Sequence, residues 1–114
     1  MATAVTEAVT ITVGTTPVLL TFSNLKYGVR LVALPSNSKF MGFGSGAAGA
    51  VSVDNSTGVV TNGAPIPQAA SGANLDSIPR EFIPAQLFLP GAVYANGLYV
   101  VGSAAGQNVV VTPA

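Results

Sequence analysis

The chain has 114 residues, no cysteine, no histidine, and only four basic and four acidic residues, so its formal net charge is zero. A chain of this length buries enough apolar surface to fold without disulfides, and we expect residues 1–114 to form a single domain. The charged fraction of 7% is far below the roughly 25% of ordinary soluble domains, and it argues against nucleic acid as a partner because phosphate binding needs clustered lysine and arginine.

The N-terminal part of the chain has the pattern of short strands. Residues 9–13, VTITV, carry a β-branched residue at every position, which is typical of a half-buried strand. Strands at 18–22, 29–34 and 39–43 are separated by turn formers, and the short link between the last two predicts antiparallel neighbours. We expect residues 1–10 to form an extended arm that can exchange with the sheet edge of another protomer.

A glycine-rich stretch, GSGAAG at 44–49, has the G-x-G-x-x-G spacing of dinucleotide-binding loops. Such a loop binds phosphate only where it opens a helix, whereas here the alternating residues 51–53 and the turn DNSTG at 54–58 follow. The acidic residue expected about 20 positions later is also absent. We therefore interpret the stretch as a loop between strands, followed by a hairpin in which 51–53 pair with 59–61.

A Pro-rich region at 62–84 has little periodicity, which predicts a long loop. Loops of this length are often functional, and we expect its C-terminal end to bind a partner. Aromatic and arginine side chains are enriched at binding hot spots, so Phe82 is the predicted apolar anchor and Arg80 the planar hydrogen-bond donor. Ile78 and Ile83 complete the predicted contact surface. The alternative is that Phe82 and Ile83 only cover the open end of the core.

The C-terminal third predicts further strands and no membrane span. Residues 86–89, 93–95, 98–101 and 109–111 are apolar runs, and Asn-Gly between the second and third is a strong hairpin signal. Gly, Pro and Asn divide residues 82–114 into pieces far shorter than the roughly 20 apolar residues of a spanning helix. The N-terminus also lacks the basic region and apolar stretch of a secretory signal.

The complete pattern gives about eight or nine short strands and no helix. The expected fold class is therefore all-β, a β-sandwich or jelly-roll-like single domain with a long Pro-rich loop, and an open barrel is the second option. The aromatic residues expected in strands and in the core are Phe22, Phe40, Phe43 and Tyr99.

Few side chains are available for chemistry. Without histidine or cysteine, the commonest general base, metal ligand and thiol nucleophile are absent. The four acidic residues are not spaced as a converging pair, and S-x-x-K at 36–39 lacks the companion motifs of penicillin-interacting enzymes. We expect no enzymatic activity, no metal and no cofactor. The low charge favours a surface covered by other protein, with a monomer solubilised by Ser, Thr, Asn and Gln as the alternative.

Three segments resemble a known family: YGVRLVALPSN at 27–37, KFMGFG at 39–44 and GLYVVGSAAGQNVVV at 97–111. They are similar to small β-sandwich virion proteins of tailed bacteriophages, of the capsid decoration (cement) or head-fibre type. The uncharged last strand and the length of the 62–84 region depart from that family.

This resemblance implies a structural virion protein that is made in the host cytoplasm, binds the major capsid protein on the outer capsid surface and reinforces the shell. It also implies a homotrimer. The alternative function is a carbohydrate- or receptor-binding module associated with a tail or fibre, for which a β-sandwich with an exposed aromatic loop is equally suitable.

Overall fold

The computed structural model describes residues 2–37, 39–68 and 80–114. Its elements are β1 (Ala2–Val5), β2 (Val9–Val13), β3 (Val18–Phe22), β4 (Gly28–Ala33), β5 (Met41–Gly44), β6 (Ser52–Val53), β7 (Val60–Thr61), β8 (Ala64–Ile66), β9 (Glu81–Pro84), the 3-10 helix η2 (Ala85–Phe88), β10 (Leu98–Gly102) and β11 (Gln107–Pro113).

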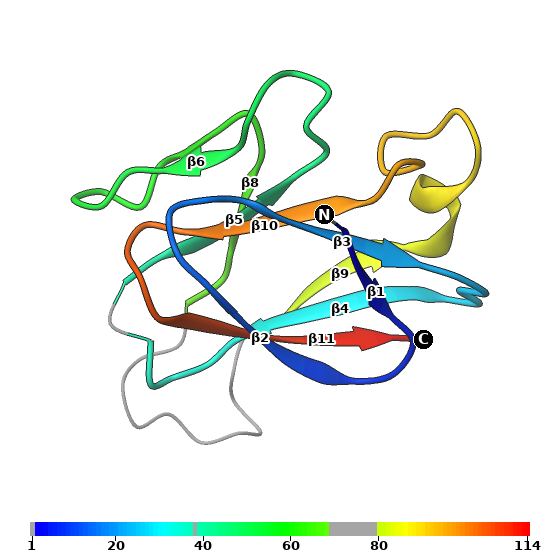
Figure 1. Cartoon of the computed structure of the whole chain (residues 1–114), viewed down its shortest axis with the longest axis horizontal. Helices are drawn as coiled ribbons and strands as arrows, with labels where there is room; N and C mark the ends of the chain where they lie inside the picture. The colour runs from blue at the N-terminus through cyan, green and yellow to red at the C-terminus, as the bar shows by residue number, and fades with distance from the viewer. Residues whose placement is uncertain (1, 38, 69–79) are drawn as a thin grey trace.

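Two β-sheets stacked face to face form the fold (Figure 1). The five-stranded sheet has the order β1-β3-β10-β5-β8 and the four-stranded sheet the order β2-β11-β4-β9. All neighbouring strands are antiparallel except β1 and β3, which run parallel. The predicted all-β fold of the β-sandwich type is confirmed.

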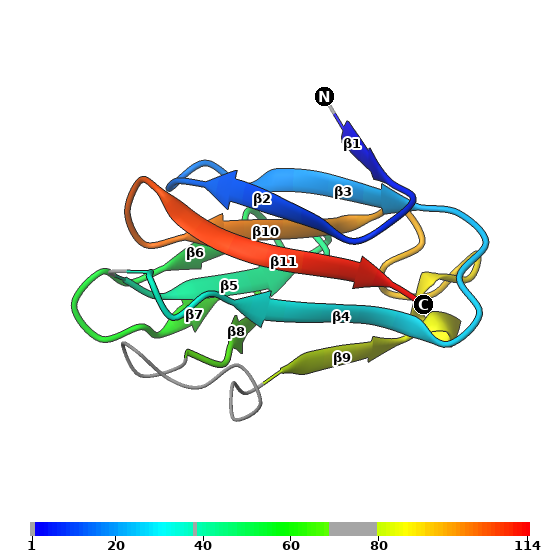
Figure 2. The same cartoon turned by 90° about the horizontal axis from the view of Figure 1, so that it is seen from below.

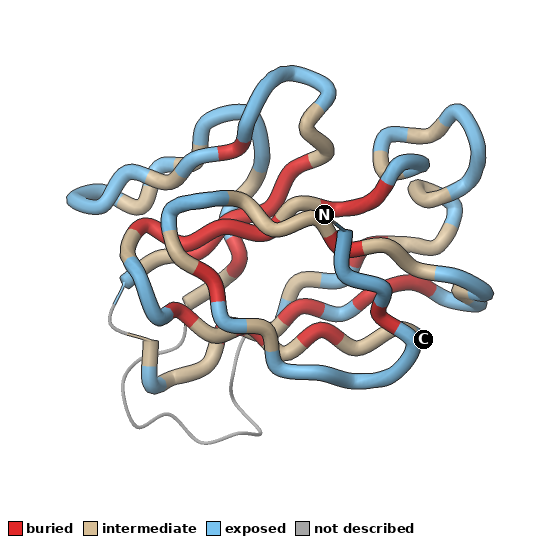
Figure 3. Tube along the Cα trace, viewed as in Figure 1, coloured by how far each residue is buried: buried red, intermediate tan, exposed pale blue. Residues whose placement is uncertain are grey.

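Buried and exposed side chains alternate along the strands, and the buried ones form the core between the two sheets. In β11, Val109 and Val111 are fully buried, whereas Asn108 and Val110, which alternate with them, are partly exposed. Burying each such side chain contributes about 1.5–3 kcal/mol, and Figure 3 shows the buried positions along the facing strands. The buried core cluster contains Val5, Val13, Leu20, Val29, Leu31, Ala33, Met41, Phe43, Ile66, Ile83, Leu98, Val100, Val109 and Val111.

The predicted hairpin around DNSTG is confirmed as β6 and β7, which pair in antiparallel register. It packs on the outer face of the five-stranded sheet, where Gly42 leaves the necessary room: a Cβ added there would lie 2.9 Å from a methyl carbon of Val60. Val101 of β10 faces away from the main core and is nevertheless fully buried. The hairpin therefore covers one part of this outer face.

The expectation that 29–34 and 39–43 are neighbouring strands is wrong, because β4 lies in the four-stranded sheet and β5 in the five-stranded sheet. The side chain of Asn37 stabilises the crossing. Its Nδ2 donates to the carbonyl of Asn108 at 2.8 Å, and the backbone N–H of Asn108 donates to its Oδ1 at 2.7 Å. The amide thus continues the ladder beside β11 after β4 has ended.

The expected hairpin between 93–95 and 98–101 is also absent, since Val93, Tyr94 and Ala95 form turns and residues 86–89 belong mostly to η2. The segment from η2 to β10 closes one end of the sandwich instead. The ring of Phe88 lies 5.3 Å from that of Phe22 and 5.5 Å from that of Tyr94, measured between centroids. Aromatic contacts of this kind add to the apolar area already buried, and they outweigh the local Asn-Gly signal.

Residues 62–84 are not one continuous loop. Strand β8 lies near the start of this region and pairs with β5, and β9 forms its end and pairs with β4. The segment between them, 69–79, lies outside the described residues.

The N-terminal arm is part of the fold in this chain. Strand β1 lies at the edge of the five-stranded sheet, and the chain then crosses to β2 in the other sheet (Figure 2). Val5 at the end of β1 is buried, whereas Ala2, Thr3 and Ala4 are exposed. Exchange of this arm between protomers stays a prediction.

Candidate binding surfaces

The four predicted contact residues do not share one surface. Ile83 is 3% exposed and lies in the core, opposite Val29 in the register. The hypothesis that it contacts a partner is therefore wrong, because the alternation of β9 turns it inward. Arg80 and Phe82 are exposed, the latter by 45%. Ile78 lies outside the described residues.

The ring of Phe82 has a defined position on the outer side of β9. It lies opposite Arg30 of β4 in the register, and a Cβ added at Gly28 would come within 2.7 Å of its Cζ. The missing side chain at Gly28 thus lets the ring lie over β4. The result is an aromatic side chain with a fixed underside and an exposed upper side.

The outer face of the four-stranded sheet, which we call the Phe82 face, continues from this ring across all four strands. Thr112, Arg30 and Phe82 form one cross-strand row, and Thr10, Val110 and Val32 form another. In the described part of the chain no other element packs over this face (Figure 1). Its residues include a single charged side chain: Thr10, Thr12, Arg30, Val32, Phe82, Asn108, Val110 and Thr112.

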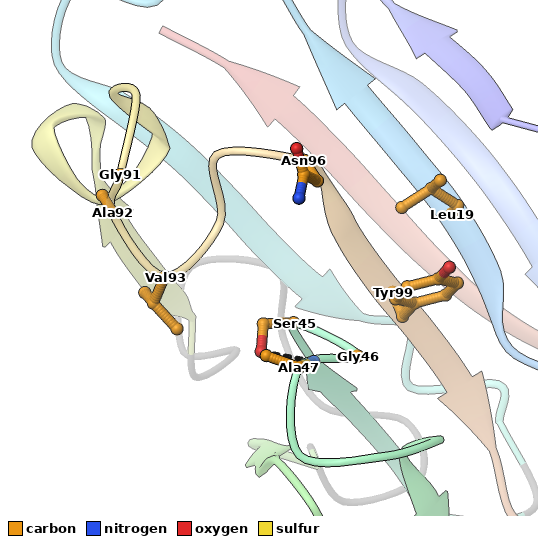
Figure 4. A pocket seen from close by; sticks show the side chains of 9 residues that line it. All are labelled: Leu19, Ser45, Gly46, Ala47, Gly91, Ala92, Val93, Asn96 and Tyr99. Carbon is orange, nitrogen blue, oxygen red and sulfur yellow. Dashed lines mark hydrogen bonds between the residues drawn. The ribbon is translucent and has the colours of Figure 1, made fainter.

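A second surface, the Tyr99 groove, lies on the outer face of the opposite sheet. It has a volume of about 420 Å³, and a neighbouring hollow of about 310 Å³ shares Gly46 and Tyr99 with it. The groove is lined by Leu19, Ser45, Gly46, Ala47, Gly91, Ala92, Val93, Asn96 and Tyr99 (Figure 4).

Strand pairing and a glycine contact position the ring of Tyr99. Tyr99 lies opposite Leu19 on one side and Gly44 on the other, and it is partly exposed because it alternates with the buried Leu98 and Val100. Gly46 has a φ of +80°, and a Cβ there would lie 2.7 Å from Cε2 of the ring. The expectation that Tyr99 packs in the core is therefore wrong.

The GSGAAG stretch forms one side of this groove and does not open a helix. Its Ser45 Oγ accepts a hydrogen bond from the backbone N–H of Ala47 at 3.2 Å. Among the described residues that line the groove, none is basic. These observations agree with the interpretation of the stretch as a loop between strands.

No local sequence pattern predicts the groove, because its lining comes from three separate parts of the chain. The one available indication was the alternation of Tyr99 with Leu98 and Val100, which turns its ring away from a core that receives the other two. Of the other aromatic residues expected in strands and in the core, Phe43 is buried and Phe22 is partly buried against the core cluster. Phe40 precedes β5 and is only partly buried.

Two titratable groups have environments that shift their pKa. Backbone hydrogen bonds from Ser56 and Thr57 lower the pKa of the exposed Asp54 below its ordinary value of 3.8. Burial, and then the charge of Glu81, raise the pKa of Tyr94. Asp54 has a turn-forming role and Tyr94 belongs to the aromatic cluster, so neither marks a reaction centre.

Within the described ranges, no group of three or more acidic, histidine or cysteine side chains could hold a metal ion. The same ranges contain no helix that is long and apolar enough to cross a membrane. Comparison with known protein families, characterised proteins and solved structures finds no match. The Phe82 face and the Tyr99 groove are therefore the two surfaces that bear on function.

Proposed function

We propose that this protein is a non-enzymatic structural component of a tailed-bacteriophage virion, a decoration (cement) protein that binds the major capsid protein on the outer surface of the shell. The resemblance of residues 27–44 and 97–111 supports this role, and a β-sandwich is the fold that the resemblance implies. The charged fraction of only 7% also supports it, because such a surface is better suited to contact with protein than to isolation in solvent.

The Phe82 face is the observation that carries the proposal. It is a sheet face of mostly β-branched side chains, with Arg30 on the inner strand β4 and the ring of Phe82 opposite it on the edge strand β9. Aromatic and arginine side chains are enriched where protein interfaces concentrate their binding energy. Removing such a face from water contributes about 25 cal/mol per Å² of apolar area, less the cost of immobilisation. Repetition over many copies turns a modest contact into reinforcement of the shell.

A homotrimer would strengthen this binding without any new type of contact. Three linked copies engage three neighbouring sites at once, and each further site is then reached at a high effective concentration. The arm containing β1 is the candidate for the link, since its exposed edge can pair with the sheet of another copy.

A tail- or fibre-associated carbohydrate- or receptor-binding module is the second candidate function, and the Tyr99 groove is the observation that favours it. The number of copies per particle distinguishes the two, because a decoration protein covers the whole shell whereas a tail or fibre component is present in few copies.

Co-sedimentation with expanded shells of the same virion tests the proposal. Phe82→Ala should weaken binding more than tenfold, since loss of an aromatic anchor from an interface costs about 2 kcal/mol. Leu89→Ala is the matched control: this side chain is 59% exposed but lies in the segment that closes the end of the sandwich. Unchanged binding of a folded Phe82→Ala protein would remove the Phe82 face from the interface.

A further inference from the structure

The Tyr99 groove combines an apolar side with polar, uncharged surroundings. In Figure 4, Leu19 and Tyr99 lie on one side of the groove, residues 91–93 on the other, and Ser45 and Asn96 between them. We propose that this groove binds a neutral carbohydrate, with one sugar ring stacked on Tyr99 and its hydroxyls hydrogen-bonded to Asn96 and Ser45. The proposal names a ligand class for the second candidate function, the carbohydrate-binding module, and rests on it. Because the site lies on the sheet opposite the Phe82 face, it does not depend on binding to a capsid.

The apolar side of the groove, formed by Tyr99 and Leu19, is pre-organised for a flat ligand. Tyr99 and Leu19 are cross-strand partners on β10 and β3, two inner strands of the five-stranded sheet, and Gly46 packs against the ring of Tyr99. The ring is thus held in place before a ligand arrives, which lowers the ordering cost of binding. A sugar ring presents flat patches of C–H groups that fit such a surface.

The polar groups match hydroxyls, which both donate and accept hydrogen bonds. The amide of Asn96 offers two donors and one acceptor, and its side chain is exposed. Ser45 Oγ accepts from the backbone N–H of Ala47, so its own O–H can still donate to a ligand.

The lining argues against other ligand classes. Its described residues include no Lys, Arg, Asp or Glu, so a phosphate, a nucleotide or an acidic sugar would lose its hydration without a charged partner among them. An extended peptide cannot add to the sheet here, because β3 and β10 already have neighbours on both sides. The volume of about 420 Å³ falls in the range of about 300–1,000 Å³ for small-molecule sites.

An NMR titration with neutral disaccharides built from glucose, galactose, mannose and N-acetylglucosamine tests this proposal. At least one disaccharide should shift the amide signals of Gly46, Gly91 and Asn96 along saturable curves. Tyr99→Phe should keep that binding within a few-fold, because it retains the ring. Tyr99→Ala should weaken it more than tenfold, and Tyr27→Ala, which removes a 64% exposed tyrosine outside the groove, should leave it unchanged.

A groove-filling variant keeps the test decisive if Tyr99→Ala does not fold. Ala47 is exposed at the rim of the groove, so Ala47→Trp should block the site without disturbing the core. The proposal is overturned if no disaccharide of the panel gives a saturable shift, or if the affinity survives Ala47→Trp. It is also overturned if glucose 6-phosphate binds more tightly than glucose, because the described lining residues include no cation that would favour the phosphate.

Discussion

Replacing Asn37 by alanine should destabilise the fold measurably, although the residue lies in a short surface link. The side chain makes two hydrogen bonds to the backbone of Asn108, of 2.8 Å and 2.7 Å, and both are partly buried. Each such bond contributes about 1 kcal/mol net, so Asn37→Ala should lower the free energy of unfolding by about 2 kcal/mol. For a chain of this size that loss corresponds to a decrease in Tm of roughly 8 °C.

Thermal and urea unfolding, followed by circular dichroism, measure this change. Asn55→Ala is the matched control, because Asn55 is exposed in the DNSTG turn and the same substitution there removes no such bridge. We expect the control to stay within about 0.5 kcal/mol of the original protein. An equally small effect for Asn37→Ala would refute the reasoning that this amide continues the ladder of β11.

Three further predictions concern Gly28 beneath the ring of Phe82, Asp54 in the DNSTG turn and the oligomeric state of the protein. Gly28 and Gly91 both have positive φ, but only at Gly28 would a Cβ collide with Phe82 and the carbonyl of Ile83. Gly28→Ala should therefore lower Tm much more than Gly91→Ala. The control Gly91→Ala should cost about 1 kcal/mol of folding free energy. The pKa of Asp54, followed by NMR, should lie below 3.8, so its stabilising effect is present above that pH and is lost as the pH falls through the folded-state pKa. Sedimentation at micromolar concentration should show a trimer, and a purely monomeric protein would contradict this.

Much of the strand content could be predicted from local pattern, because period-two alternation reflects burial on one side of a strand. The assignment of strands to sheets could not. The link between β4 and β5 is short whether it turns within a sheet or crosses between sheets, and the deciding contact joins Asn37 to Asn108, 71 positions away in the chain. Likewise, Asn96-Gly97 is a genuine local hairpin signal, but the packing of Tyr94 against Phe88 places the preceding residues elsewhere.

The candidate sites likewise combine features that a local sequence pattern predicts with features that depend on distant contacts. Phe82 and Ile83 are adjacent in sequence, yet adjacent residues of a strand face opposite sides, so one is exposed and the other is in the core. The sequence predicts a loop for 62–84, and only the pairing of β9 with β4 imposes the alternation that separates the two side chains. The Tyr99 groove depends on three distant segments meeting on one sheet face, and no local pattern contains that information.

Binding to assembled shells, compared with binding to free capsid subunits, tests the proposed decoration role most directly. A site that spans two or three subunits exists only after the lattice has formed, and a trimer adds avidity on that lattice. We therefore predict that the protein co-sediments with expanded shells at concentrations at which it shows no association with free subunits. Equal affinity for shells and free subunits would contradict a lattice-spanning site, and absence of binding to the shells would contradict the decoration role itself.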